Sequence, residues 1–342
     1  MIALALTEFG GINGLHFKEF PDPLPREGEV LIKVQACALN HVDLLIMRGR
    51  PGVALPHVGG CDVAGEITEV GHGVGTHYLG NAVIVNPVLS CGRCWYCRAG
   101  EQSLCEEFRI FGRDTWGGLA EYVTVPVENV IPLPKNLSWA EAATIPVVFM
   151  TAWRLLVTKA KVQPGEKVLV WGAGGGVGSA AIQIAKLFHA TVIATTRGRE
   201  KRELARSLGA DDVIDPEAED VIDRVAELTS GKGVDIVVDT VGTPTWPKSL
   251  QILRKGGRLV VCGASAGPIG ETDLRYLWRK QISIHGSSMA NATEFETVLR
   301  MVEQGLLHPV IYKIVAFTHA KEAFREMQSA ERFGKVVVTF AA

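Results

Sequence analysis

The chain has 342 residues, of which 21% are charged and 47% hydrophobic, and its formal net charge is −2. These values are ordinary for a globular protein, and the length suits two domains that each bury a core. The net charge excludes the basic surface of a nucleic-acid-binding protein and the polybasic patch of a membrane-binding protein. No apolar run approaches the roughly 20 residues that span a bilayer. We therefore expect a small-molecule partner, with no nucleic acid and no membrane.

The first 135 residues alternate short apolar segments with Gly/Pro turns. This pattern is typical of a mostly antiparallel β domain. It predicts one helix at residues 40–47 and strands at residues 1–6, 29–39, 62–70, 82–85 and 119–125.

Four cysteines lie close together in the pattern C-x2-C-x2-C-x7-C, at Cys91, Cys94, Cys97 and Cys105. Four thiolates suit one tetrahedral zinc and close it against water, so we expect one structural zinc in a lobe at residues 88–110. A pair of disulfides is the alternative. With only three other cysteines and no secretory signal before the first predicted strand, we expect a reducing, cytoplasmic location, which favours zinc.

From about residue 151 short apolar strands alternate with helices, which predicts a parallel sheet covered on both faces. The last part of the chain predicts two further helices and two strands, and the apolar final strand is expected to join the N-terminal β domain. The expected domains are 1–149 with 289–342, and 150–288. The predicted strands of the second domain are 167–171, 191–195, 234–239, 258–262 and 282–285, with helices at 177–188, 200–208 and 220–229; the closing elements are 294–304, 320–329 and 335–340.

A glycine-rich turn joins the strand at 167–171 to the helix at 177–188. Glycines in this context let the chain turn tightly and let backbone N–H groups approach a pyrophosphate at the helix N-terminus. A purely structural turn is the alternative. The predicted cofactor-binding residues here are Gly172, Gly174, Gly175, Gly176, Val177 and Gly178.

The end of the next strand indicates which dinucleotide binds. A carboxylate there would bond the ribose 2′-hydroxyl of NAD, but this chain has Thr195, Thr196 and Arg197. Hydroxyls and a guanidinium suit a 2′-phosphate, so we expect NADP(H) in preference to NAD(H), unless Arg197 is simply a solvated loop charge. Gly263, after a later strand, is a further predicted cofactor contact.

These features together resemble the medium-chain dehydrogenase/reductase superfamily over essentially the whole chain. The cysteine lobe is similar to the structural-zinc lobe of its alcohol dehydrogenases, and the other matching segments are Pro146–Trp153, Ser207–Asp212, Val238–Gly242 and Phe333–Val337. The resemblance implies an α/β protein with a GroES-like, mostly β catalytic domain and a Rossmann domain with a doubly wound parallel sheet. It also implies pairing of two copies along the strand at 282–285, hence a homodimer or homotetramer.

The catalytic zinc of the family's alcohol dehydrogenases is not expected here. The three positions that correspond to its ligands hold Asn40, Cys61 and Val147, and valine cannot bind a metal. Asn40 and Asp62 instead resemble the zinc-free quinone oxidoreductase and enoyl reductase branches, which usually lack the cysteine lobe.

Several residues remain as catalytic candidates. Asn40 could donate a hydrogen bond to the substrate oxygen, hold the nicotinamide ribose or cap the following helix. His41 could donate a proton or contact a cofactor phosphate, and Asp43 could orient His41 or favour the helix N-terminus. Cys61 is either a buried thiol or a remaining metal ligand with His41, Asp43 or Asp62.

The favoured hypothesis is an NAD(P)(H)-dependent oxidoreductase that reduces a carbonyl or an activated C=C bond, as in a quinone, enone or enal, without a standard catalytic zinc. One alternative is an alcohol dehydrogenase with a non-standard zinc site that includes Cys61. The other is a dinucleotide-binding protein with negligible turnover.

Overall fold

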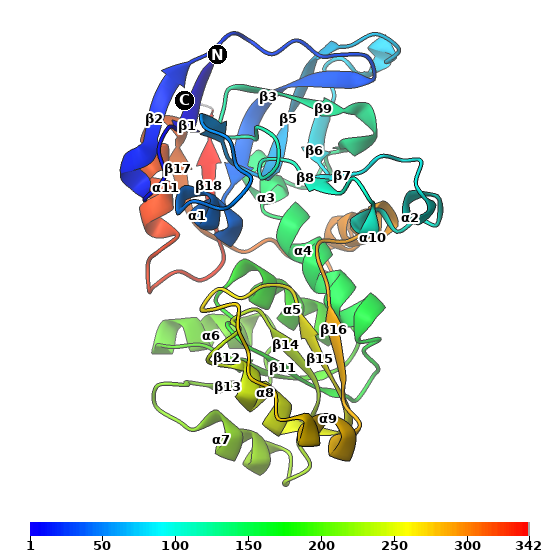
Figure 1. The fold of residues 1–342 in the computed structure, drawn as a ribbon, viewed down its shortest axis with the longest axis vertical. Helices are drawn as coiled ribbons and strands as arrows, with labels where there is room; N and C mark the ends of the chain where they lie inside the picture. Colours follow the sequence, from blue (N-terminus) through cyan, green and yellow to red (C-terminus); the bar gives the residue numbers. More distant parts are fainter. Residues whose placement is uncertain (341–342) are drawn as a thin grey trace. The chain divides into compact units, whose positions relative to one another are not determined.

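The computed structural model describes residues 1–340. The chain forms two compact units (Figure 1). The β-rich unit comprises Met1–Val147, Asn291–Glu303 and the segment from Pro309 onward; the parallel-sheet unit comprises Val148–Ala290 and Gln304–His308. Within the described residues, no helix is long and apolar enough to cross a membrane.

The main sheet of the β-rich unit has the order β10-β6-β5-β3-β18-β17, with β9 also paired to β3. The long central strand β3 pairs with β5 along one edge. Along its other edge it pairs first with β9 and then, nearer its C-terminal end, with β18. The last strand of the chain therefore completes the sheet begun by the first hundred residues, as the sequence predicts. The strands are β3 Glu29–Ala38, β5 Asp62–Val70, β6 Ala82–Val85, β9 Tyr122–Pro126, β10 Val130–Pro132, β17 Ile311–Ala316 and β18 Lys335–Thr339.

Two smaller sheets and five helices complete this unit within the described part of the chain. The sheets have the orders β2-β1-β4 and β7-β8. Their strands are β1 Ile2–Leu6, β2 Leu15–Glu19, β4 His57–Val58, β7 Val88–Leu89 and β8 Arg109–Ile110. The helices are α1 His41–Met47, α2 Trp95–Arg98, α3 Trp139–Ala143, α10 Ala292–Glu303 and α11 Ala320–Glu326. The chain passes into the other unit within α4 Pro146–Trp153.

The parallel-sheet unit holds six strands in the order β13-β12-β11-β14-β15-β16, and every pair is parallel. This is the doubly wound order, in which the direction of winding reverses between the first and fourth strands and leaves a crevice at their carboxyl ends. The strands are β11 Lys167–Val170, β12 Thr191–Thr195, β13 Asp212–Ile214, β14 Val234–Asp239, β15 Leu253–Val261 and β16 Ser283–Gly286.

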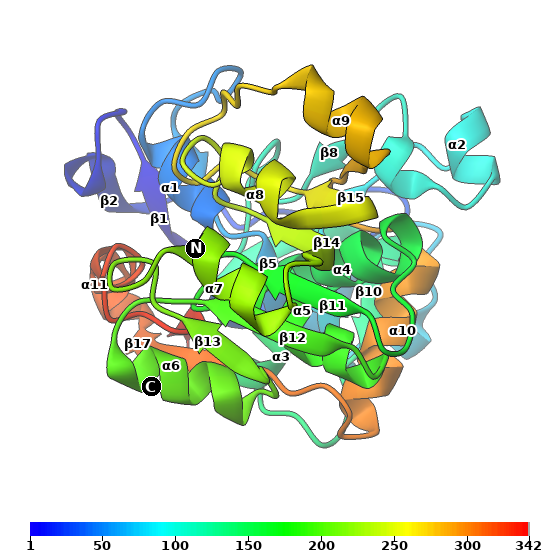
Figure 2. The ribbon, with the colours of Figure 1, turned by 90° about the horizontal axis from the view of Figure 1, so that it is seen from below.

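Helices cover both faces of this sheet. Helices α7 and α8 pack with one face through a core that includes Leu169, Ile193 and Val237, and residues of α9 pack against that core. Helices α5 and α6 lie on the opposite face (Figure 2). Their bounds are α5 Gly176–Leu187, α6 Arg199–Ser207, α7 Val221–Leu228, α8 Trp246–Ile252 and α9 Leu274–Lys280. Because helices cover both faces, the inner strands β11, β12 and β14 are mostly apolar and buried, which confirms the predicted fold class.

Candidate functional site

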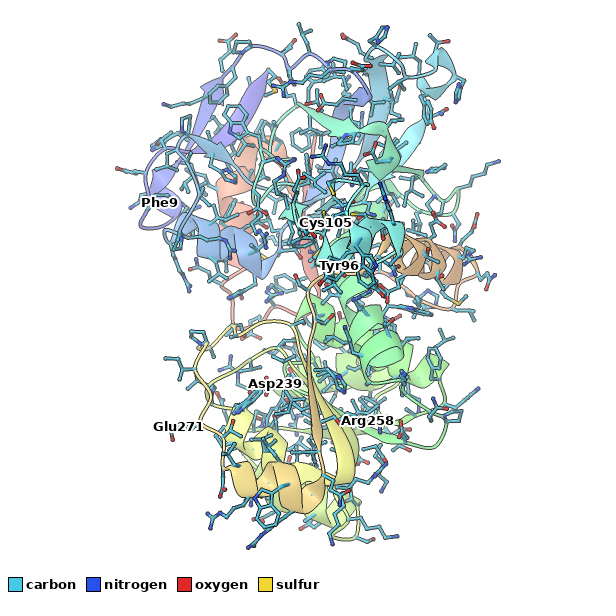
Figure 3. All side chains as sticks on the ribbon, turned by 45° about the vertical axis from the view of Figure 1, so that its right-hand side comes forward. Phe9, Tyr96, Cys105, Asp239, Arg258 and Glu271 are labelled. Atoms are coloured by element: carbon cyan, nitrogen blue, oxygen red, sulfur yellow. The ribbon has the colours of Figure 1, made fainter. Side chains whose placement is uncertain are left out.

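The four cysteines of the lobe converge on one point. Their sulfur atoms all lie within 4.8 Å of one another, and Cys105 lies in the lobe shown in Figure 3. Backbone N–H groups point at the sulfurs: that of Cys91 donates to Cys105 Sγ at 3.2 Å, and that of Cys94 donates to Cys91 Sγ at 3.4 Å. Such bonds stabilise thiolates, which are the zinc-binding form of cysteine.

This donor set fits one structural zinc. Four sulfurs fill a tetrahedral shell and leave no position for substrate or water. All seven cysteines are free thiols, so the disulfide alternative is not realised in the structure. Among residues 1–340 this is the one group of three or more His, Cys, Asp or Glu side chains placed to share a metal ion. Zinc here would hold the loop and take no part in the reaction.

A second polar cluster lies where β3, β5 and β18 meet, and it contains Asn40, Asp62 and Lys335. The Lys335 ammonium donates to Asn40 Oδ1 at 2.6 Å and to Asp62 Oδ2 at 2.9 Å. The Asn40 amide donates to the same Asp62 oxygen at 2.8 Å, and the backbone N–H of Val147 donates to Asp62 Oδ1 at 2.8 Å. All three side chains are buried, so this is a paired and hydrogen-bonded ion pair within the protein interior.

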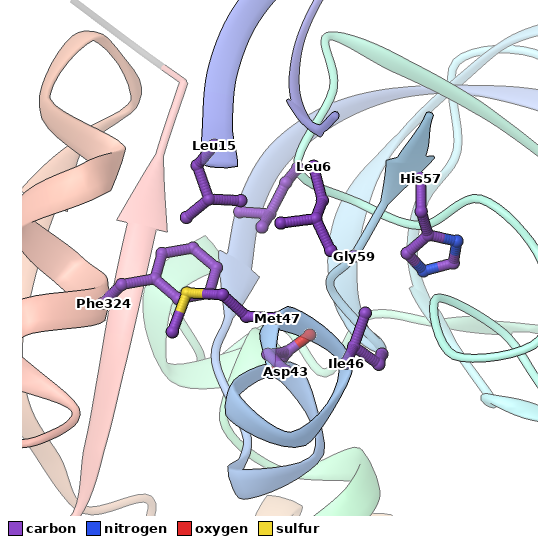
Figure 4. Close-up of a pocket in the computed structure, with 9 residues that line it drawn as sticks. Leu6, Leu15, Asp43, Ile46, Met47, His57, Gly59 and Phe324 are labelled. Atoms are coloured by element: carbon purple, nitrogen blue, oxygen red, sulfur yellow. The ribbon is translucent and has the colours of Figure 1, made fainter. Parts of the chain in front are cut away.

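Asp43 joins the two segments that carry these residues. It lies in the first turn of α1, and its carboxylate accepts the backbone N–H of Asn40 at 2.7 Å and that of Gly60 at 2.9 Å. Burial raises the pKa of Asp43 to about 6. Asp43 and His57 also line a small, mostly apolar cavity (Figure 4). Asp43 thus supports the backbone at Asn40 and Gly60.

His41 has a ring nitrogen without a hydrogen-bond partner among residues 1–340, whereas Cys61 is a fully buried thiol. His41 is half-buried, its Nε2 has no hydrogen-bond partner among residues 1–340, and burial with nearby Arg48 and Arg332 lowers its pKa. The Nε of Arg332 is likewise buried without a partner in that range. Cys61 is fully buried and its pKa is raised well above the usual value, which favours the neutral thiol.

A catalytic zinc does not fit these residues. Asn40 is bonded through both its oxygen and its amide to Lys335 and Asp62, and Val147 contributes only a backbone N–H, which goes to Asp62. Cys61 belongs to no group of three potential ligands in the described part of the chain. An ammonium beside the site would also oppose a dication.

The turn between β11 and α5 requires glycine at two positions. Gly172 has φ +67°, a conformation that L side chains rarely adopt. A Cβ on Gly178 would lie 2.4 Å from the carbonyl oxygen of Gly172, so helix α5 can approach the end of β11 only with glycine there. The helix begins after Gly175, its N-cap residue. Gly174, Gly176 and Val177 occupy the same turn and first helical residues.

The end of β12 differs in part from a simple 2′-phosphate site. Thr195 is buried and its hydroxyl accepts the N–H of Gly172 at 3.2 Å, so it supports the glycine turn. Thr196 is also buried. Arg197 is exposed and pairs with Glu217 at 3.0 Å. Gly263 follows β15 and lies close to the loop after β14, since a Cβ on it would be 3.8 Å from the carbonyl oxygen of Thr240.

Sequence reasoning missed two residues of these sites. Lys335 is the one charge in the apolar strand Lys335–Thr339, and a buried lysine requires a carboxylate partner, which is a signal the sequence contained. Glu217 follows β13, and only the pairing of β12 with β13 brings its segment beside Arg197. No local sequence signal points to that contact.

Two family models and several known proteins match this chain. The family model described as "Zinc-binding dehydrogenase" matches residues 176–304, and that described as "Alcohol dehydrogenase GroES-like domain" matches residues 26–135. An NAD-dependent alcohol dehydrogenase of Sulfurisphaera tokodaii is 34% identical over 99% of each chain. An acryloyl-coenzyme A reductase of Metallosphaera sedula is 34% identical over 98% of this chain and 99% of its own. A crystal structure of an NAD-dependent alcohol dehydrogenase superposes with a TM-score of 0.95 at 42% identity, covering 100% of both chains.

These matches extend over the whole chain and include both units. They set aside the hypothesis of a dinucleotide-binding protein without turnover, because the relatives are named dehydrogenases and reductases. The chain therefore belongs to the zinc-binding alcohol dehydrogenase family of the medium-chain dehydrogenase/reductase superfamily and is an oxidoreductase.

Proposed function

We propose that this oxidoreductase reduces a carbonyl or an activated C=C bond, as in a quinone, enone or enal, without a catalytic zinc. The observation that carries the proposal is the buried Asn40–Asp62–Lys335 cluster, in which Asn40, at a position that the resemblance gives to a zinc ligand, is bonded to a lysine and an aspartate instead. A relative named as an acryloyl-coenzyme A reductase supports an activated alkene as the acceptor.

In this proposal Asn40 stabilises the negative charge that develops on the substrate oxygen. Bound NAD(P)H would supply the hydride. One N–H of the Asn40 amide is used by Asp62, and the other is left for the oxyanion. Lys335 donates to the oxygen of the same amide, which polarises it and strengthens its remaining N–H as a donor. Asp62 pairs with the ammonium of Lys335 and accepts a hydrogen bond from the Asn40 amide, which keeps that amide oriented.

Two buried nitrogen atoms beside α1 could each donate a hydrogen bond to a phosphate of the cofactor. His41 Nε2 and Arg332 Nε are both buried without partners among residues 1–340, and a phosphate oxygen would satisfy them. The lowered pKa of His41 makes it a poor proton donor at neutral pH, so we assign it to binding. The substrate's proton would then come from solvent.

An alcohol dehydrogenase with an unorthodox zinc at Cys61 is the competing hypothesis, and metal content separates the two. We expect one zinc per chain by elemental mass spectrometry. Cys61→Ser should keep that zinc and the reductase activity, whereas Cys94→Ser should lose the zinc. Two zincs in the wild type, with one lost in Cys61→Ser, would contradict the proposal and favour the alternative.

We propose NADP(H) in preference to NAD(H), although relatives are named NAD-dependent. Support comes from the sequence of β12, which ends on Thr195 with no carboxylate, and from the exposed guanidinium of Arg197, which is 3.0 Å from Glu217 and would exchange that partner for a phosphate. Arg197→Ala should lower kcat/KM for NADPH about tenfold and leave that for NADH nearly unchanged. Equal losses with both cofactors would refute the assignment.

We also propose a homodimer or homotetramer that pairs through β16. This strand is the edge of the parallel sheet, and the apolar side chains of Leu274, Trp278 and Ile284 near it are exposed. Pairing with a second copy would cover both the open edge and these side chains. A monomer at all micromolar concentrations in sedimentation would contradict this.

A further inference from the structure

Asp239 ends β14, and its side chain is fully buried. Among residues 1–340 its carboxylate forms no ion pair, and it accepts hydrogen bonds from neutral donors. Oδ1 accepts the backbone N–H groups of Val241 at 2.9 Å and Gly242 at 3.1 Å. The hydroxyl of Thr245 lies 2.9 Å from both oxygens, and that of Ser249 donates to Oδ2 at 2.8 Å. A buried carboxylate therefore determines the course of the loop that follows β14 (Figure 3).

This network extends to the first strand. The indole Nε1 of Trp171, the residue before the glycine turn, donates to Ser249 Oγ at 2.9 Å, so one hydroxyl links Asp239 to the end of β11. The loop after β14 also approaches the turn directly. A Cβ on Gly172 would lie 3.5 Å from Val241 Cγ2 and 3.8 Å from Thr240 Oγ1. The spacing between the loop and the turn thus depends on Asp239.

The same loop is bonded to the segment after β15. The N–H groups of Ser265 and Ala266 donate to the carbonyls of Thr240 at 3.1 Å and Val241 at 2.8 Å. Three carboxyl ends, those of β11, β14 and β15, are therefore held together around one buried carboxylate. In a doubly wound sheet these ends form the crevice that receives the dinucleotide, and β14 begins the half opposite β12 and β13.

We propose that Asp239 is a positioning residue for the cofactor, which fixes the loop at residues 240–243 against the glycine turn so that the half of the dinucleotide beyond the pyrophosphate can bind. This rests on the proposed use of NAD(P)H. The adenosine half is bound at the ends of β11 and β12, so its affinity does not depend on Asp239 in the same way.

Affinity for whole and half cofactors tests this. Asp239→Asn removes the charge and one acceptor oxygen while keeping the side-chain size. We expect its Kd for NADPH, or for NADH if that cofactor binds more tightly, to rise about tenfold, with the Kd for adenosine 5′-monophosphate within twofold of wild type. KM for the cofactor should rise by a similar factor, with kcat changed less.

Asp235→Asn is the matched control. Asp235 begins the same strand, and its carboxylate accepts the Lys167 N–H at 2.7 Å and pairs with Arg254. We expect this variant to lose thermal stability without losing NADPH affinity. Wild-type NADPH affinity in Asp239→Asn, or parallel losses for NADPH and the monophosphate in both variants, would overturn the inference and leave Asp239 a purely structural residue.

If Asp239→Asn does not fold, the variant Ser249→Ala tests the inference instead. It removes the link to Trp171 and one donor to Asp239, and we expect a threefold to fivefold rise in the NADPH Kd. An unchanged Kd would overturn the inference. Failure of the wild type to bind either dinucleotide would overturn the proposed function itself. The wild-type measurement alone separates this outcome from a failure of the inference about Asp239.

Discussion

Replacing Lys335 by methionine removes the one cation of the buried cluster while keeping the length and apolar stem of the side chain. Lys335 is 4% exposed and Asp62 is 0% exposed, so water cannot replace the lost ammonium. Removing one partner of a buried ion pair costs about 3–5 kcal/mol. Asp62 keeps hydrogen bonds from Asn40 and Val147, so we expect a loss at the lower end, about 3 kcal/mol.

Calorimetry measures the loss. For a cooperative unit of this size about 3 kcal/mol lowers Tm by roughly 6–12 °C. Lys33→Met is the control, because Lys33 is exposed on β3 and its replacement should change stability by less than about 0.5 kcal/mol. Adding Asp62→Asn to Lys335→Met removes the isolated charge and should restore part of the stability. A Tm of Lys335→Met within about 2 °C of wild type would refute this account of the cluster.

Three further predictions concern the other sites. Cys94→Ser should lose zinc and lower Tm by several degrees, and an unchanged zinc content by mass spectrometry would contradict the four-sulfur site. Burial raises the pKa of Asp43 to about 6, so the fold is more stable when this carboxyl is protonated. The unfolding free energy of wild type relative to Asp43→Asn should therefore fall by about 2 kcal/mol between pH 4 and 7, and a flat difference in urea titrations would refute this. Gly178→Ala places a methyl 2.4 Å from the Gly172 oxygen and should abolish detectable NADPH binding, whereas near-normal binding would show that the turn can shift.

Local patterns sufficed where a residue's role depends on its own neighbours in the chain. The cysteine spacing predicted a convergent lobe, and the glycines between an apolar strand and an amphipathic helix predicted the turn at the end of β11. Short elements were missed: β13 has three residues, and β4, β7 and β8 have two each, too few for any period to show. Their existence depends on partner strands.

The buried Asn40–Asp62–Lys335 cluster was only half predictable. Asn40 and Asp62 stand out in the sequence because they resemble the zinc-free branches of the superfamily, and Asn40 replaces a zinc ligand of its alcohol dehydrogenases. Lys335 lies 273 positions from Asp62 in sequence, and only the antiparallel pairing of β18 with β3 brings the two together. Asp239 was predicted as the end of a strand, but its donors come from the loop that follows and from Thr245 and Ser249 at and within α8, and they could not be assigned without the placement of that helix.

The position of β18 has a consequence for synthesis on the ribosome. The parallel-sheet unit is almost continuous in sequence, so it can fold while later residues are still being made. The β-rich unit cannot, because β18 lies between β3 and β17 and carries Lys335. Until residues 335–339 emerge, β3 keeps an open edge and Asp62 has no counter-ion. We therefore expect nascent chains that bind dinucleotide before they can reduce any substrate.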